Sequence, residues 1–154
     1  MMIKEFAEAA ATSQTMKEIN DSNYPRFGDM MESMGYDWEP MKVTTEDDYI
    51  LTTFHILGKS DGSTAAPSQG SVLIQHGDLE DGTSWMTNYT NLDQVPFHLL
   101  LVDAGYDVYV GSNRGTEYSW DHMTLDSSTD PEYWNWTWAE MGLYDDTANI
   151  SAIK

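Results

Sequence analysis

The chain has 154 residues, which suits one domain with its own core and is too short for two ordinary domains. Its formal net charge is −19, which argues against nucleic acid and anionic membranes as direct partners. It contains no cysteine, so disulfides and cysteine-based zinc sites are excluded. No stretch approaches the roughly 20 apolar residues that a transmembrane helix needs, and the first residues lack the apolar region of a signal peptide.

The N-terminal part is expected to be helical. Residues 2–19 carry apolar side chains loosely on one side of a helix, and polar residues with a proline break the pattern at 20–25. A short helix is predicted from about Arg26 to Met34, with Gly35 as its C-terminal cap. We therefore expect an N-terminal helical extension over residues 1–29 and a second region over residues 30–154.

The middle of the chain changes to a strand pattern. Residues 41–45 and 49–57 are rich in β-branched and aromatic residues, and the acidic residues 46–48 between them suit a turn. The two segments are predicted to form an antiparallel hairpin. Residues 58–70 have the composition of an exposed loop.

Two buried strands with a helix between them follow. The run of residues 71–75 is short, apolar and bounded by glycines, which is typical of a buried parallel strand. Residues 92–104 fit a helix that ends at Gly105, and residues 106–110 fit a second buried strand. This β-α-β unit predicts an α/β fold, with a partly parallel sheet and flanking helices.

The last predicted helix begins at Pro131 and includes Trp134, Trp138, Met141 and Tyr144 at helical spacing. Trp134 and Trp138 would then share one face of this helix, and we expect them in the core. Trp136 would point elsewhere, which makes it a candidate for a protein interface.

Five blocks in this order resemble the acid lipase family of gastric and lysosomal lipases. They are VTTEDDYIL at 43–51, LIQHG at 73–77, WMTN at 85–88, DAGYDVYVGSNRG at 103–115 and the segment from Trp134 to Asp145. The resemblance covers roughly residues 30–150. It implies the N-terminal half of an α/β-hydrolase: a β-hairpin followed by the first parallel strands of the sheet with flanking helices.

The same resemblance shows what the sequence lacks. The family's nucleophile lies in a G-x-S-x-G turn, and its acid and histidine follow later in the chain. The one match to G-x-S-x-G in the 154 residues, GKSDG at 58–62, lies in the predicted exposed loop and not in a turn between a buried strand and a helix. We therefore predict no catalytic residue in this chain, which would be non-catalytic by itself. Three readings stay open: a non-catalytic subunit of a larger assembly, one half of a split or processed lipase, and a fragment with no biology of its own.

The loop after the strand at 71–75 is the candidate oxyanion loop, formed by His76, Gly77, Asp78 and Leu79. In α/β-hydrolases a backbone N–H from this loop stabilises the oxyanion. The resemblance places the donor at Asp78, where the family has leucine. A carboxylate beside a developing oxyanion opposes acyl transfer. Leu79 as the donor is the alternative register. A hydrogen-bonded structural His76 in a tight turn is the alternative to any catalytic role.

A second loop, after the strand at 106–110, contains Gly111, Asn113, Arg114 and Gly115. We interpret it as a structural turn in which Arg114 binds a buried or partly buried carboxylate. No pair of histidines has the spacing of a metal site on a predicted helix, so no metal and no cofactor are expected.

The fold expectation has a consequence for partners. In an α/β-hydrolase sheet, the strand that precedes the nucleophile lies next to the strand at 71–75. Without it, Val72, Leu73 and Ile74 would form an apolar edge, a feature that folded proteins normally cover. Leaving such side chains in water forgoes roughly 1.5–3 kcal/mol each. We therefore expect another protein chain, or residues 1–30 of this chain, to complete or cover the sheet.

A lipid substrate is expected only for a completed fold. The family resemblance suggests a lysosomal or secreted protein, and the sequence itself leaves the compartment open.

Overall fold

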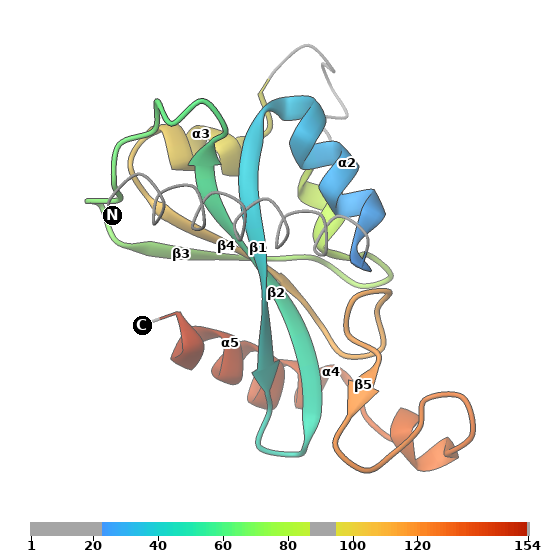
Figure 1. Ribbon diagram of the computed structural model, residues 1–154. Helices are drawn as coiled ribbons and strands as arrows, with labels where there is room; N and C mark the ends of the chain where they lie inside the picture. Colours follow the sequence, from blue (N-terminus) through green and yellow to red (C-terminus); the bar gives the residue numbers. More distant parts are fainter. Residues whose placement is uncertain (1–22, 87–94, 154) are drawn as a thin grey trace, which may run out of the picture.

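The computed structural model describes residues 23–86 and 95–153 (Figure 1). The helix predicted at residues 2–19 lies outside this range. The elements in chain order are α2 (Pro25–Met34), β1 (Tyr36–Thr44), β2 (Tyr49–Lys59), β3 (Ser71–Gln75), a 3-10 helix (Gly82–Met86), α3 (Phe97–Asp103), β4 (Asp107–Ser112), β5 (Asp121–His122), a 3-10 helix (Pro131–Trp134), α4 (Trp138–Glu140), a π-helix (Met141–Asp145) and α5 (Asp146–Ala152).

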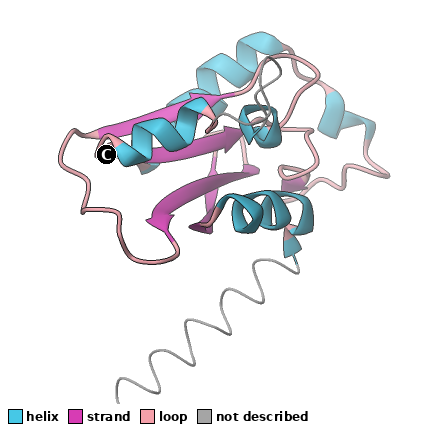
Figure 2. Ribbon diagram, turned by 90° about the horizontal axis from the view of Figure 1, so that it is seen from above, coloured by secondary structure: helices cyan, strands magenta, loops and turns pink. Residues whose placement is uncertain are grey.

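The strands form one mixed sheet in the order β1-β2-β4-β3, with β5 paired to β2. The pairs β1–β2 and β2–β4 are antiparallel, and β3 runs parallel to β4. The predicted hairpin and the predicted β-α-β unit are both confirmed, because β3 and β4 are parallel neighbours joined through α3. Figure 2 shows helices on both sides of this sheet, consistent with part of an α/β-hydrolase fold.

Helix α2 closes one side of the sheet. Pro25 lies in its first turn, and Gly35 ends it in the left-handed conformation with φ of 75°. Phe27 and Met31 are fully buried in the core. The helix therefore runs across residues 29 and 30, between which the sequence placed a boundary.

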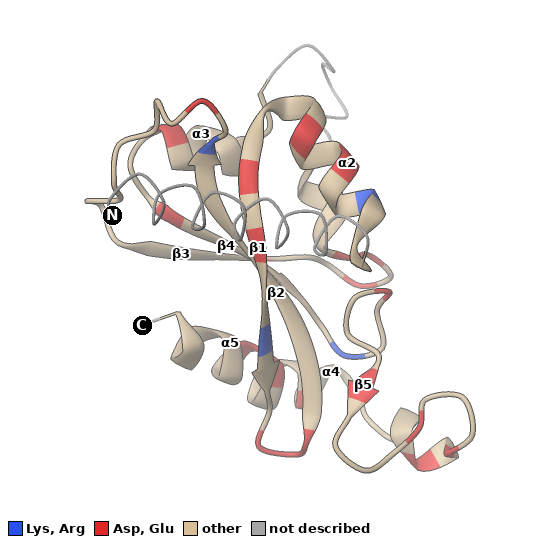
Figure 3. Cartoon of the chain, in the orientation of Figure 1, with Lys and Arg blue, Asp and Glu red and all other residues tan. Residues whose placement is uncertain are grey.

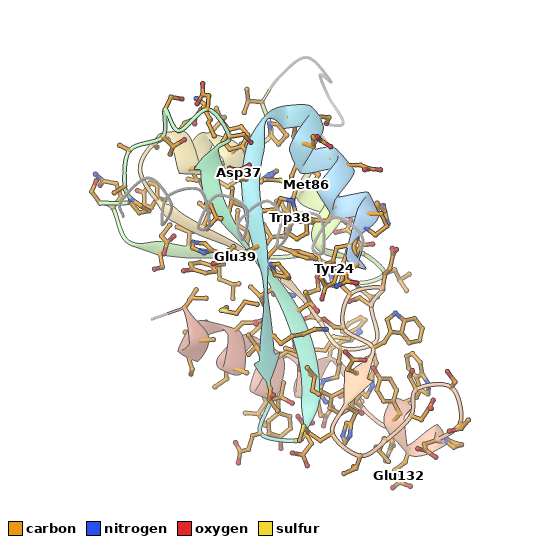
Figure 4. The ribbon with its side chains drawn as sticks, viewed as in Figure 1. Tyr24, Asp37, Trp38, Glu39, Met86 and Glu132 are labelled. Atoms are coloured by element: carbon orange, nitrogen blue, oxygen red, sulfur yellow. The ribbon has the colours of Figure 1, made fainter. Side chains whose placement is uncertain are left out.

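The main core lies between α2, α3 and one face of the sheet. Phe27 stacks on Phe54 of β2 with ring centroids 3.8 Å apart, and Trp38 of β1 meets both rings edge-on. Figure 4 shows Tyr24, Trp38 and Met86 gathered beside α2. Aromatic side chains thus supply much of the buried apolar area of this core.

The opposite face of the sheet carries α5. Thr53 precedes Phe54 on β2, so its side chain points away from the main core. Its hydroxyl donates to Oδ1 of Asn149 on α5 over 2.6 Å, and both residues are fully buried. A second buried cluster, made of Val43, Tyr49, Leu51 and Tyr133, lies near the β1–β2 turn. None of the helices in the described parts of the chain is long and apolar enough to cross a membrane.

Several predicted elements shift in the structure. The strand predicted at 41–45 begins five residues earlier, at Tyr36, and the strand predicted at 49–57 ends two residues later, at Lys59. Helix α3 begins at Phe97, whereas the sequence placed its start at 92; residues 92–94 lie outside the described range, and 95 and 96 are not helical. Pro96 explains this start, because the residue before a proline is held out of the helical conformation. Strand β4 spans Asp107–Ser112, so the strand predicted at 106–110 begins one residue later and extends two residues further.

The predicted single helix from Pro131 is wrong. A 3-10 helix ends at Trp134, and a new helical segment begins only at Trp138. Trp134 and Trp138 therefore do not share a helix face, and they are 42% and 71% exposed rather than core. The physical reason is Thr137, whose extended backbone caps the second segment together with Glu140.

Removing this cap is expected to destabilise the protein. Oγ1 of Thr137 accepts the N–H of Ala139 at 3.2 Å, and the Glu140 carboxylate accepts the Thr137 N–H at 2.7 Å. Thr137→Ala should lower the free energy of unfolding by about 1 kcal/mol in urea denaturation. Thr137→Ser keeps the hydroxyl and is the matched control. Equal stability of both variants and the wild type would show that the cap contributes nothing.

Candidate functional site

The two candidate loops meet at the carboxyl ends of neighbouring parallel strands. Gln75 ends β3 and lies opposite Gly111 of β4, so residues 76–79 and 113–115 leave the sheet side by side. Ligands of open α/β sheets bind outside the carboxyl ends of their strands. The fold therefore places both loops where such a sheet binds its ligand.

His76 ties the two loops together. Its Nε2 accepts the backbone N–H of Asn113 at 3.0 Å, and its Nδ1 lies 2.8 Å from the Gly77 carbonyl oxygen. Because Nε2 is an acceptor, Nδ1 carries the proton and donates to that carbonyl. The Gln75 side chain adds a bond from Nε2 to Asn113 Oδ1 at 2.8 Å. The buried His76 thus has both ring nitrogens engaged in contacts with the two loops.

The oxyanion-loop candidates form a tight turn. Asp78 and Leu79 are its central residues, and Leu79 adopts a positive φ of 59°. The N–H of Gly77 donates to the carboxylate of Glu80 at 3.2 Å. The Asp78 side chain is exposed, and Leu79 is 99% exposed. Two carboxylates, those of Asp78 and Glu80, therefore lie in the same turn as the candidate backbone donors at positions 78 and 79.

Arg114 binds two carboxylates. Its Nε and Nη2 donate to Asp145 at 2.9 and 2.7 Å, and its Nη1 and Nη2 donate to Asp47 at 2.6 and 2.8 Å. The guanidinium also lies 3.9 Å from the centre of the Tyr49 ring. Burial lowers the pKa of Arg114, but the bonds to the two carboxylates outweigh it and raise the pKa overall. The arginine therefore fixes the turn at 113–115 to the hairpin and to the C-terminal helices.

A cavity of about 610 Å³ opens between the two loops and the C-terminal helices. This volume is within the usual range for small-molecule sites. Its described lining holds one hydroxyl group, Thr116, which donates to the Asn113 carbonyl at 2.7 Å. In the two described stretches of the chain, no group of three histidine or acidic residues could hold a metal ion.

The lining of the cavity combines acidic and apolar side chains. Five carboxylates line it: Asp78, Glu80, Asp81, Glu117 and Asp146. Trp136, Trp138 and Met141 contribute apolar surface. Burial raises the pKa of Asp146, and the nearby His76 opposes this shift. Acidic residues also far outnumber lysine and arginine over the rest of the chain (Figure 3).

The interface candidates lie in two places. Ile74 is buried in the main core, whereas Val72 and Leu73 are half-buried on β3, the outermost strand of the described sheet. Trp136 is half-buried and packs on Gly115, where an added Cβ would come within 2.8 Å of the indole ring. Trp136 therefore packs on the turn at 113–115, which Arg114 fixes in place, and also lines the cavity.

Sequence reasoning missed the C-terminal wall of the cavity. Trp138, Met141 and Asp146 reach it because the helical segment begins anew at Trp138 and continues through a π-helix. The signal was present in the sequence as a capping-box pattern, with Thr137 followed by Glu140. The prediction of one continuous helix from Pro131 left this capping box unused.

Comparison with known proteins agrees with this fold. Residues 27–89 match the family model described as "Partial alpha/beta-hydrolase lipase region". The chain is 39% identical over 120 residues to human "Lysosomal acid lipase/cholesteryl ester hydrolase", covering 77% of this chain and 29% of that protein. It is 38% identical over 126 residues to mouse "Lipase member K", covering 81% of this chain and 30% of that protein.

A plant protein is also similar: Arabidopsis "Triacylglycerol lipase 2" is 42% identical over 113 residues, covering 72% of this chain and 26% of that protein. The chain thus spans less than a third of the length of each of these relatives. The matched family region and the lipase relatives together identify the chain as an N-terminal part of an acid-lipase-family α/β-hydrolase.

Proposed function

We propose that this chain is the oxyanion-loop half of an acid-lipase-like hydrolase, non-catalytic by itself and completed by or docked on another protein chain. The observation that carries the proposal is the cavity at the ends of β3 and β4. It has the position of a hydrolase site, yet its one described hydroxyl, Thr116, is bonded to a backbone carbonyl and has no histidine as base.

The charges of the loop support the non-catalytic part of the proposal. Acyl transfer needs positive dipoles around the oxyanion. Here Glu80 accepts the Gly77 N–H, and the exposed Asp78 adds a second negative charge. His76, the one histidine in the described lining, has both ring nitrogens engaged and offers no free base.

The exposed side of β3 supports a protein partner. Within the described residues, β3 pairs only with β4, so its other edge presents unpaired backbone groups. An open strand edge is a template for another strand. Val72 and Leu73, both half-buried, would be covered by such a strand.

The alternative is a split or processed lipase that hydrolyses lipid esters, with serine, aspartate and histidine supplied by the partner chain. The position of the cavity favours it, because the nucleophile of a completed α/β-hydrolase sits at this same end of the sheet.

One experiment separates the readings. The protein is purified from its source under native conditions, weighed by native mass spectrometry, treated with a fluorophosphonate probe and assayed on a fatty-acid p-nitrophenyl ester. We expect a complex in which neither this chain nor its partner is labelled. A labelled serine on the partner, with ester hydrolysis, would establish the split lipase instead. Labelling of this chain, or a protein that remains alone, would overturn the proposal.

A further inference from the structure

The cavity has two properties that together point to a class of ligand. Its described lining holds five carboxylates, and its one arginine, Arg114, is fully buried and bound to Asp47 and Asp145. Arg114 therefore offers no free positive charge to a ligand. Arg26 lies outside the lining and binds Asp81 and Glu117 at 3.1 and 3.2 Å. The remaining three lining carboxylates have no cationic partner among the described residues.

Several apolar side chains of the lining are accessible to solvent. Trp138 is 71% exposed and Leu79 is 99% exposed, and both line the cavity. Trp136 joins them, and its indole N–H is buried without a hydrogen-bond partner in the described structure. Large apolar side chains left in water at the mouth of a cavity are a common feature of a ligand site.

We propose that this cavity binds organic cations that carry an apolar group, such as alkyl or aromatic ammonium compounds. The carboxylates attract the positive headgroup, and the tryptophan rings interact favourably with a cation and with the apolar substituent. The same field repels a fatty-acid carboxylate, which carries the opposite charge. The inference goes beyond the proposed function, because it assigns a ligand class to the cavity whether or not a partner supplies a nucleophile.

Three matched ligands test the proposal. 4-Phenylbutylammonium, 4-phenylbutanamide and 4-phenylbutyrate share a phenyl group on a four-carbon chain and differ in headgroup charge. Titration calorimetry on the 154-residue protein should give the tightest binding for the ammonium compound. Its Kd should be at least about tenfold below that of the carboxylate at low salt, given the energy of unit charges a few ångströms apart. Raising the salt to about 1 M should remove most of this preference.

Two substitutions locate the binding. Asp78→Asn should weaken binding of the ammonium compound by about fivefold, because it removes one exposed charge from the lining. Asp29→Asn, an equal change of charge on exposed α2 outside the lining, should leave it unchanged. Trp138→Leu should also weaken binding by about fivefold. Trp120→Leu is its control, since Trp120 is exposed and does not line the cavity.

Three results would overturn the inference: equal or tighter binding of 4-phenylbutyrate, equal effects of Asp78→Asn and Asp29→Asn, or no detectable binding of the ammonium compound. None of these measurements involves an ester or a partner chain. Failure of the proposed function, by contrast, is read from labelling and assembly, so the two outcomes are independent.

Discussion

Asp145→Asn is expected to lower the free energy of unfolding by about 3–5 kcal/mol, the usual cost of breaking a buried ion pair from one side. Asp145 is fully buried and accepts three N–H groups of Arg114: the backbone N–H, Nε and Nη2. The asparagine keeps the shape of the side chain but leaves the buried guanidinium with one carboxylate instead of two. Urea denaturation with an unchanged slope measures the loss.

Asp47→Asn is the matched control for this prediction. It also removes a carboxylate bound to Arg114, but the Asp47 side chain is 29% exposed, so water can replace part of the lost interaction. We expect a clearly smaller loss of stability than for Asp145→Asn. If the Asp145 variant loses less than about 1 kcal/mol, the network does not hold the turn at 113–115 to the C-terminal helices.

The strands could be predicted from the sequence because their signals are local. The run at 71–75 is apolar and bounded by glycines, and the structure places β3 at Ser71–Gln75. The hairpin of β1 and β2 follows from β-branched residues on either side of an acidic turn. Gly35 predicted the end of α2, because glycine readily adopts the left-handed conformation found there.

The cavity could be predicted only in part. Placing the loops at 76–79 and 113–115 at one end of the sheet requires nothing more than the parallel direction of β3 and β4. The position of Trp136 and Trp138 in the lining depends on where the 3-10 helix ends, at Trp134. Helical spacing in the sequence does not predict that end. The hydrogen bond between Gly77 and Glu80 closes a turn in which Leu79 has a positive φ. Leucine rarely adopts a positive φ, so the sequence gives no signal for this turn.

The negative charge of the chain has a specific consequence at the cavity. Composition alone leaves three explanations for an excess of acidic residues: solubility, a basic protein partner or cation binding. The structure concentrates five of these residues around one cavity and engages its arginine elsewhere. The same charges that oppose an oxyanion favour an organic cation, so a weakened hydrolase site and a cation site are two consequences of one arrangement.

His98 is expected to make the protein less stable in acid. It lies fully buried in α3, and burial lowers its pKa from 6.5 to about 4, with only partial opposition from the Trp85 backbone. Above pH 6.5 both folded and unfolded chains carry a neutral His98. As the pH falls from 6.5 to about 4, His98 becomes protonated in the unfolded chain but stays neutral in the folded chain. Stability therefore falls through this window, by about 3 kcal/mol in total from this residue.

His98→Leu removes the titrating group with a modest change in volume, so its stability at pH 7.5 should lie within about 1.5 kcal/mol of the wild type. Urea denaturation of both proteins at several pH values then isolates His98, because every other titrating group contributes equally to the two curves. Between neutral pH and about pH 4, the free energy of unfolding of the variant should rise relative to that of the wild type by about 3 kcal/mol. A constant difference across that range would mean that folded His98 accepts its proton as readily as the unfolded chain does. The ring would then have access to water or to an acceptor, and the packing of α3 against the sheet would have to open at that point.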